Sequence, residues 1–268
     1  MTKPKHTGHR EADAHELAYF IRVANESGAE AEAELEEPLS FLSNIDRLYV
    51  DFFGEAGGIR PPTAGILLLN AHASLRAAIR LALSGQLLPV YMVLRGSIES
   101  ALYAHAMVVN PELQDVWLNR GKDGESRQAC RNAFTVAKVF RYLEQAHEKE
   151  FSDGLRDVYE ATIDFGAHPN SQSIISSVRI EELTSGSHAL DFAYIHGVGS
   201  FELRQALVAC AESALAGFFV ALLSFKNHPR LVMLNELALE LQGRVPSFIE
   251  GLELDAPTNE KVKPRVQI

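Results

Sequence analysis

The dominant hydrophobic period along the chain is that of an α-helix. Apolar residues recur at spacings of three and four, which places them on one side of a helix. Glycine and proline, which favour breaks, separate most of these segments. The pattern predicts a first helix near residues 11–26, helices at 39–53, 63–84, 87–109, 125–150, 152–164, 200–226 and 230–250, and a short helix ending at Trp117. We therefore expect a mainly α protein.

The period changes between residues 174 and 195. Apolar and polar residues alternate over 174–180 and again over 190–195, as in half-buried strands, and Thr184-Ser185-Gly186-Ser187 lies between them. This predicts a small β-hairpin inserted before the last long helix. No internal repeat or long linker divides the 268 residues. We expect one helical bundle domain over 1–268, with its core at about 62–228 and flexible tails at 1–10 and 255–268.

The segment Leu87–Val109 is almost wholly apolar, and its only formally charged residues are Arg95 and Glu99. Residues four apart share one helix face, so the two side chains can pair. In a helix that is apolar all round that face is buried, and a buried charge is costly unless it is paired. The pair therefore predicts either an internal structural clamp or the floor of a site.

The preceding helix carries further polar side chains on one face. His72, Arg76 and Arg80 follow one another at intervals of four. Since this helix is the sequence neighbour of the apolar one, we expect Arg76 or Arg80 to give Glu99 a second partner. His72 and Arg76 thus join Arg95 and Glu99 as candidate ligand-binding residues.

A second candidate lies in the run Asp164-Phe165-Gly166-Ala167-His168-Pro169-Asn170. Pro169 favours an extended conformation of His168, which places the imidazole in a stiff loop beyond a helix C-terminus. That end of the helix dipole favours a cationic imidazole, and Asp164 could orient it. Such a histidine suits acid–base work or anion recognition. The alternative is a histidine that only bonds the last helical carbonyls.

Composition limits the classes of function. The formal charge of −10 disfavours nucleic acid and anionic membranes, although a local basic patch could override the net balance. Cys130 and Cys210 have no metal-type spacing, and the first residues lack the apolar core of a secretory signal. The apolar run 206–225 carries Glu212 near its middle, which favours a buried core helix over a membrane span. We expect a cytoplasmic protein with no membrane segment, metal or cofactor.

The helix carrying Leu94-Arg95-Gly96-Ser97-Ile98-Glu99, a long connecting helix and the Gly-Ala-His-Pro-Asn turn at 166–170 follow one another in this order. This order resembles an uncharacterised group of mostly bacterial helical proteins, distantly HEPN-like. The resemblance covers about residues 62–228, and its anchors are Arg95, Glu99, His168 and Pro169. It implies a helical bundle and directs attention to these residues, but it brings no activity.

Other motif matches are incomplete. The pairs Arg10/His15 and Arg141/His147 fit the loose Arg-x(4–6)-His spacing of HEPN-type ribonucleases, but neither pair lies among the anchors. Glu144 and His147 match half of a di-iron motif that has no second copy here. No phosphate-binding glycine loop or nucleophile motif occurs.

Three functions stay open. The first is a helical protein whose internal polar pocket, built from Arg95, Glu99 and His168, binds a small ligand or a protein partner. The second is a HEPN-like ribonuclease of a defence or toxin system, with Arg95, Glu99 and His168 as candidate catalytic residues. The third is a structural module that forms a homodimer through the small residues Ala211, Ala214 and Gly217.

Overall fold

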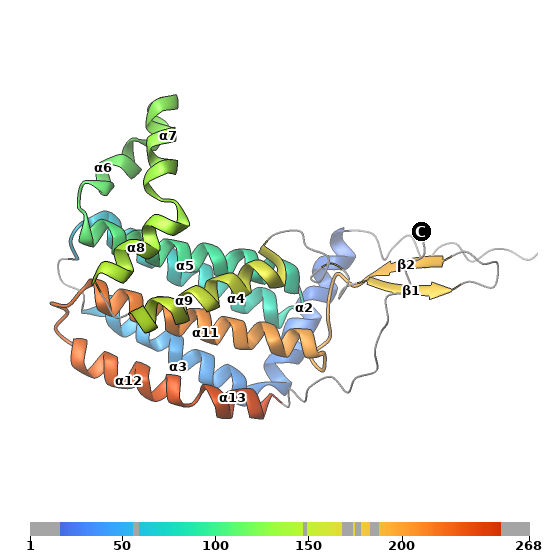
Figure 1. The fold of residues 1–268 in the computed structure, drawn as a ribbon. Coiled ribbons are helices and arrows are strands. Elements are labelled where there is room, and N and C mark those ends of the chain that lie inside the picture. The colour runs from blue at the N-terminus through green and yellow to red at the C-terminus, as the bar shows by residue number, and fades with distance from the viewer. Residues whose placement is uncertain are drawn as a thin grey trace, which may run out of the picture.

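The chain folds into a bundle of helices with a two-stranded hairpin at one end (Figure 1). The computed structural model describes residues 17–55, 59–146, 149–167, 174, 178–182 and 188–252. The helices are α2 (Leu17–Glu34), α3 (Glu36–Gly54), α4 (Pro62–Leu83), α5 (Leu87–Val109), α6 (Leu113–Leu118), α7 (Gly124–Ala133), α8 (Val136–Ala146), α9 (Lys149–Thr162), α11 (Phe201–Ser224), α12 (Leu231–Gly243) and α13 (Val245–Gly251). The turns η1 (Asn119–Gly121) and η2 (Ile163–Ala167) complete the helical part.

The most apolar helices lie at the centre of the bundle, and the other helices pack around them. α5 lies against α4 and α11, and α11 also contacts α3, α9, α12 and α13. α6 and α7 rise away from the bundle as an arm (Figure 1). The prediction of a mainly α bundle is confirmed. Strands β1 (Val178–Glu182) and β2 (His188–Phe192) pair antiparallel, with Val178 opposite Phe192 and Glu182 opposite His188.

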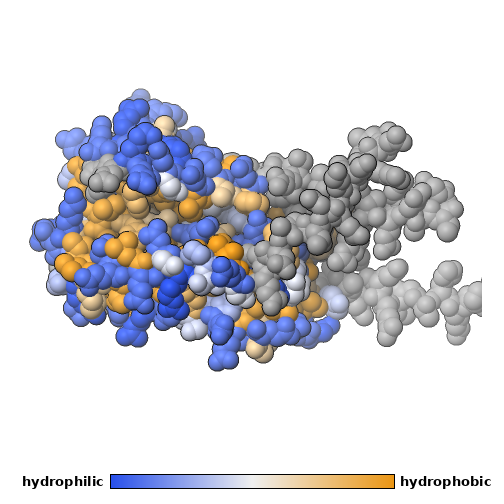
Figure 2. All heavy atoms as spheres, turned by 60° about the horizontal axis from the view of Figure 1, so that its bottom comes forward, coloured by the Kyte–Doolittle hydropathy of each residue, from blue (hydrophilic) through white to orange (hydrophobic). Residues whose placement is uncertain are grey.

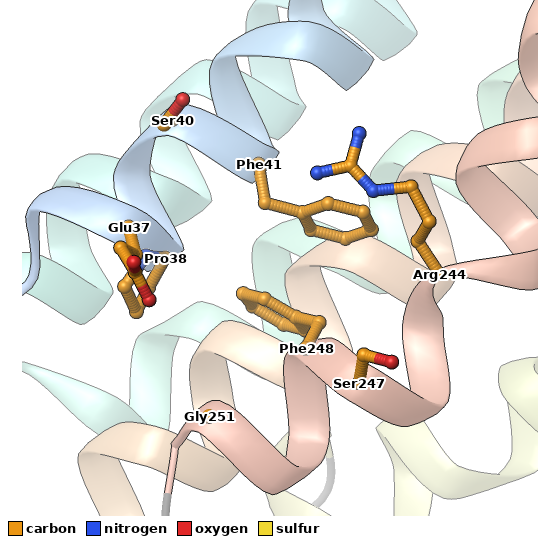
Figure 3. Close-up of a pocket in the computed structure, with 8 residues that line it drawn as sticks. All are labelled: Glu37, Pro38, Ser40, Phe41, Arg244, Ser247, Phe248 and Gly251. Atoms are coloured by element: carbon orange, nitrogen blue, oxygen red, sulfur yellow. The ribbon is translucent and has the colours of Figure 1, made fainter.

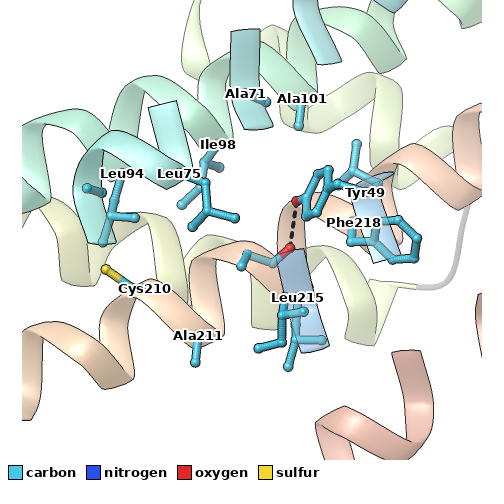
Figure 4. Packing of buried hydrophobic residues seen from close by; sticks show 14 of the residues in the cluster. Tyr49, Ala71, Leu75, Leu94, Ile98, Ala101, Cys210, Ala211, Leu215 and Phe218 are labelled. Atoms are coloured by element: carbon cyan, nitrogen blue, oxygen red, sulfur yellow. Dashed lines mark hydrogen bonds between the residues drawn. The ribbon is translucent and has the colours of Figure 1, made fainter. Parts of the chain in front are cut away.

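The core is centred on α11, which is buried on nearly every side. Figure 4 shows Tyr49 of α3 reaching α11, where its hydroxyl donates a hydrogen bond of 2.7 Å to the carbonyl oxygen of Ala214. Burial makes that bond important, because an unpaired buried hydroxyl is costly. Ala211 and Ala214 are buried, and a Cβ at Gly217 would lie 3.0 Å from the Tyr49 hydroxyl.

The proposed dimer face of small residues is therefore wrong. Ala211, Ala214 and Gly217 are covered by other helices of the same chain, so no second copy can reach them. Small side chains at these positions instead let α3 and α5 approach α11 closely.

One predicted helix is broken. The predicted helix 125–150 is divided among α7, α8 and the start of α9, and at the end of α7 the Phe134 carbonyl accepts a bond of 3.0 Å from the Tyr103 hydroxyl. Asp123 caps α7 by accepting a bond of 2.7 Å from the Ser126 amide. Breaking the helix here lets α8 and α9 turn back and cover α5.

The ends of other helices match their sequence signals. Ser200 caps α11 by accepting a bond from the Leu203 amide, as its position predicts. Gly85 follows α4 with φ +73°, and a Cβ there would collide with the His196 backbone. Only glycine combines this conformation with so close an approach. The predicted tails at 1–10 and 255–268 lie outside the described residues.

Two helices, α4 and α11, are long and apolar enough to cross a membrane by length and composition. Core helices of soluble proteins meet the same criterion, and two thirds of the apolar window of α11 is buried inside the bundle. Burial within the fold therefore accounts for much of the apolar surface of α11.

Candidate functional site

The predicted pair on α5 exists, and it is closed by a tyrosine of α9. Arg95 Nε lies 2.9 Å from Glu99 Oε1 and donates to the Tyr159 hydroxyl at 3.1 Å. The Tyr159 hydroxyl in turn donates to the same Glu99 oxygen at 2.9 Å. Arg95 also lies over the Tyr159 ring, with its Cζ 5.5 Å from the centroid. These three side chains, the α5–α9 clamp, join two helices.

Charges in the α5–α9 clamp are matched. Burial opposes ionisation of Arg95, but the hydrogen bonds and electrostatic attraction of Glu99 and Tyr159 together outweigh it, so the pKa of Arg95 is raised. Burial and the negative charge of Glu99 raise the pKa of Tyr159 far above its usual value. Tyr159 thus stays protonated near neutral pH, and its hydroxyl is already used in the triangle. The geometry favours the structural interpretation of the pair over the floor of a site.

The expected neighbours of Glu99 lie elsewhere. Arg76 donates two hydrogen bonds to Asp46 of α3, from Nε to Oδ1 at 2.7 Å and from a terminal nitrogen to Oδ2 at 2.8 Å. Arg80 donates to Asn25 of α2. The expected pairing of Glu99 with Arg76 or Arg80 is therefore wrong, because the polar face of α4 turns towards α2 and α3.

His72 belongs to this second cluster, which we call the α3–α4 clamp: Asp46, His72 and Arg76. His72 Nε2 lies 2.6 Å from Asp46 Oδ1, and its ring stacks on Tyr49 at 4.8 Å between centroids. Burial lowers the pKa of His72 despite the nearby carboxylate. The bond from Arg76 lowers the pKa of Asp46. A neutral His72 then donates from Nε2 to the ionised Asp46.

The structure describes only the first part of the second candidate, the run from Asp164 to Asn170. Asp164 is exposed in η2, which packs against α5. Gly166 has φ +152°, and a Cβ there would lie 3.2 Å from the Leu88 carbonyl oxygen, so this turn is built around glycine. His168 and Pro169 lie outside the described residues, as do Arg10, His15 and His147.

An apolar recess lies elsewhere, between α9, α11 and the junction of α12 with α13. It has a volume of about 620 Å³ and is named here the acidic groove. Its lining residues are Glu150, Phe151, Gly154, Leu155, Val158, Glu212, Leu215, Ala216, Phe219, Gln242, Val245 and Pro246. Figure 2, with the α12–α13 side turned forward, shows hydrophobic residues gathered below the hydrophilic arm.

Glu212 is the chemically distinctive residue of the acidic groove. Its side chain reaches solvent, but the apolar groups around it remove much of its hydration and raise its pKa. No cation among the described residues lies within ion-pair distance of Glu212 or Glu150. A smaller recess of about 140 Å³ shares Val158 and Glu212 with the groove and extends towards Tyr91 and Phe165.

Sequence reasoning had one signal for this groove, the lone acid in the apolar run 206–225. It did not identify Asp46, Tyr159 or Glu150, because nothing in their local sequence marks the helix that each one faces.

Another pocket, of about 360 Å³, lies between α3 and α13 (Figure 3). Phe41 and Phe248 stack at 4.5 Å between centroids, and Arg244 lies over the Phe41 ring at 5.6 Å. Glu37 lines the side away from Arg244 in Figure 3. Because its lining carries both signs of charge, this pocket favours no single ligand charge.

Among the described residues, no group of three or more histidine, cysteine, aspartate or glutamate side chains is arranged to hold a metal ion. Cys130 and Cys210 are buried, and burial raises the pKa of both thiols. Neither is therefore a ready nucleophile near neutral pH. Comparisons of the chain with protein-family models, curated proteins and solved structures give no significant match.

Proposed function

We propose that this protein binds a small amphipathic cation in the acidic groove: a molecule with an apolar body and a protonated amine. The main observation is the groove itself, an apolar recess in which the charged lining residues that the structure describes are both carboxylates, Glu150 and Glu212. The proposal keeps the predicted class of ligand-binding helical protein. It moves the site from Arg95 and Glu99 on α5 to the recess that α9 forms with α11, α12 and α13.

Size and lining support a small molecule. Pockets for such ligands span about 300–1,000 Å³, and the groove, at about 620 Å³, lies within this range. Phe151 of α9 and Phe219 of α11 contact each other edge to face, with centroids 6.4 Å apart, and supply a rigid aromatic wall. An apolar ligand body placed against them would lose contact with water, which favours binding.

Charge supports a cation. Glu212 has lost hydration without gaining a described cationic partner, so an ammonium group beside it would restore favourable electrostatics. Val158 and Glu212 line both the acidic groove and the smaller recess beside it. Glu150 lies about two turns from Val158 along α9, which is about 12 Å by helix geometry. Glu212 is thus the partner nearest the middle of the apolar surface, and Glu150 lies towards one end.

The test is calorimetric titration with three probes that share one apolar body. These are 4-phenylbutylamine, 4-phenylbutanol and 4-phenylbutyrate, which are cationic, neutral and anionic. We expect the amine to bind about tenfold more tightly than the alcohol, since a charge-assisted contact contributes more than a neutral one. The carboxylate should bind most weakly.

Two variants assign the effect to the groove. Glu212→Gln keeps the shape and should bring the amine and the alcohol to similar affinity, whereas Ala216→Trp should fill the groove and weaken all three probes. Glu26→Gln, which removes an exposed carboxylate of α2, is the control for net charge and should leave binding unchanged. Equal binding of the three probes to the unaltered protein, or tightest binding of the carboxylate, would refute the proposal.

No cluster of side chains among the described residues favours the ribonuclease alternative. The HEPN-like relationship, the cytoplasmic location and the absence of a membrane segment stay predictions. The homodimer also stays a prediction, although its proposed face is excluded.

A further inference from the structure

A pocket of opposite charge lies where the arm joins the bundle. It has a volume of about 400 Å³ and is lined by Leu113 of α6, Ala133 of α7, and Lys138, Arg141, Tyr142 and Gln145 of α8. We call it the cationic pocket. Among its described lining residues the formally charged ones, Lys138 and Arg141, are cations, so its electrostatic preference is the reverse of that of the acidic groove.

The two cations are not neutralised within the part of the chain that the structure describes. Lys138 and Arg141 are exposed, and neither forms an ion pair with a described carboxylate. Glu144, one turn beyond Arg141 on α8, instead pairs with Arg156 of α9 at 3.0 Å. Elsewhere exposed arginines do find partners, such as Arg22 with Glu26 and Arg47 with Asp51. Unlike those two arginines, Lys138 and Arg141 have no described carboxylate within ion-pair distance.

The spacing on α8 brings several hydrogen-bond donors to one face. Positions 138, 141, 142 and 145 are separated by three or four residues and follow one side of the helix. The guanidinium of Arg141 can bind two oxygens at once, Lys138 supplies a point charge, and Gln145 adds an amide. The Tyr142 hydroxyl already accepts a bond of 3.4 Å from Asn110 and can still donate its own proton.

We propose that the cationic pocket binds a phosphomonoester on a small organic body. A phosphomonoester carries a charge of about −1.5 to −2 at pH 7 and three acceptor oxygens in a tetrahedral arrangement. Donors that converge from four positions of one helix match these three oxygens better than the two coplanar oxygens of a carboxylate. Leu113 and Ala133 supply a small apolar wall for the organic body. This site is separate from the acidic groove and does not depend on the function proposed for it.

Calorimetric titration at pH 7.5 and low ionic strength tests the assignment with phenyl phosphate, phenyl sulfate and benzoate. The first two share a tetrahedral anion and an aromatic body but differ in charge. We expect phenyl phosphate to bind with a dissociation constant in the millimolar range or below, and at least threefold more tightly than either other probe. Inorganic phosphate should compete, and added salt should weaken binding.

Variants link the binding to named residues. Lys138→Ala with Arg141→Ala should weaken phenyl phosphate binding at least tenfold. Arg141→Lys, which keeps the charge but loses the two-pronged contact, should produce an intermediate loss. Arg22→Ala with Arg47→Ala changes net charge equally at exposed cations outside the pocket and should leave binding intact.

Circular dichroism of each variant monitors folding, which exposed substitutions should preserve. The proposal is overturned if phenyl phosphate does not bind the unaltered protein at millimolar concentration. It also fails if the two double variants lose affinity equally, because the effect would then come from net charge, or if benzoate binds as tightly as phenyl phosphate.

Discussion

The two clamps and the two recesses use the same residue types in opposite ways. In the α5–α9 clamp, Arg95, Glu99 and Tyr159 satisfy one another, and in the α3–α4 clamp Asp46 bonds both His72 and Arg76. In the acidic groove and the cationic pocket, charges of one sign gather and find no described partner of the other sign. Charge matching thus marks the two clamps, and the unmatched charges beside the two recesses are those for which we propose ligands.

This contrast has an energetic basis. Removing one member of a matched, partly buried pair leaves the other desolvated and unpaired, so the fold loses stability. Removing an unmatched charge leaves no other charged group without its partner. The fold therefore tolerates the change, and the substitution affects ligand binding rather than stability. Each of the following substitutions tests one side of the contrast.

The largest effect is expected for Asp46→Ala, which deprives both Arg76 and the buried His72 of their partner. The free energy of unfolding should fall by about 2–3 kcal/mol. Chemical denaturation measures it. Asp51→Ala on the same helix is the matched control, since its partner Arg47 is exposed, and the loss there should stay below about 1 kcal/mol. Equal losses in the two variants would contradict the clamp.

Glu99→Ala should cost about 1–2 kcal/mol of unfolding free energy, because Arg95 and Tyr159 lose a shared acceptor. The cost is smaller than for Asp46 because Asp46 bonds the buried His72 as well as Arg76, whereas solvent reaches both charged members of the α5–α9 clamp. Thermal and denaturant unfolding provide the measurement. Glu144→Ala, which breaks the more exposed pair with Arg156, is the comparison and should cost less.

Acid should weaken the α3–α4 clamp. The pKa of His72 is lower in the folded protein than its ordinary value of 6.5, so the unfolded chain binds the proton more readily. Stability from this group is present above pH 6.5 and is lost as the pH falls towards the lowered value. The slope cannot exceed about 1.4 kcal/mol per pH unit for one proton. Unfolding curves between pH 7.5 and 5 should show a shallower slope in His72→Gln than in the unaltered protein.

The smallest effect, and one of opposite sign, is expected at Glu212. Burial raises its pKa above the ordinary 4.5, so the folded state favours the protonated form, and ionisation destabilises the fold as the pH rises. Glu212→Gln should therefore raise the melting temperature at pH 7.5 by about 1 °C, and this gain should vanish below pH 4.5. A clear loss of stability at pH 7.5 would mean that Glu212 has a structural partner.

The clamp and the groove differ in how far sequence could predict them. The i, i+4 spacing fixed the Arg95–Glu99 pair, because both residues lie on one helix and their geometry is local. The third member, Tyr159, comes from another helix 60 residues away. The expected approach of Arg76 or Arg80 to Glu99 was wrong for the same reason, since sequence neighbours need not turn their polar faces towards each other.

What the sequence determined by itself is local. Its hydrophobic period set the helical class and the positions of the long helices α4, α5 and α11, the cap at Ser200 follows from a single side chain, and the lone Glu212 stands out within an apolar run. The tertiary structure decided which faces meet. It broke the predicted helix 125–150 at Phe134 and buried the small residues of α11. It also left Glu212 with Glu150, and Lys138 with Arg141, beside open recesses. The physical reason is that backbone hydrogen bonding and capping act within a few residues, whereas charge matching depends on how helices distant in sequence rotate to bury apolar surface.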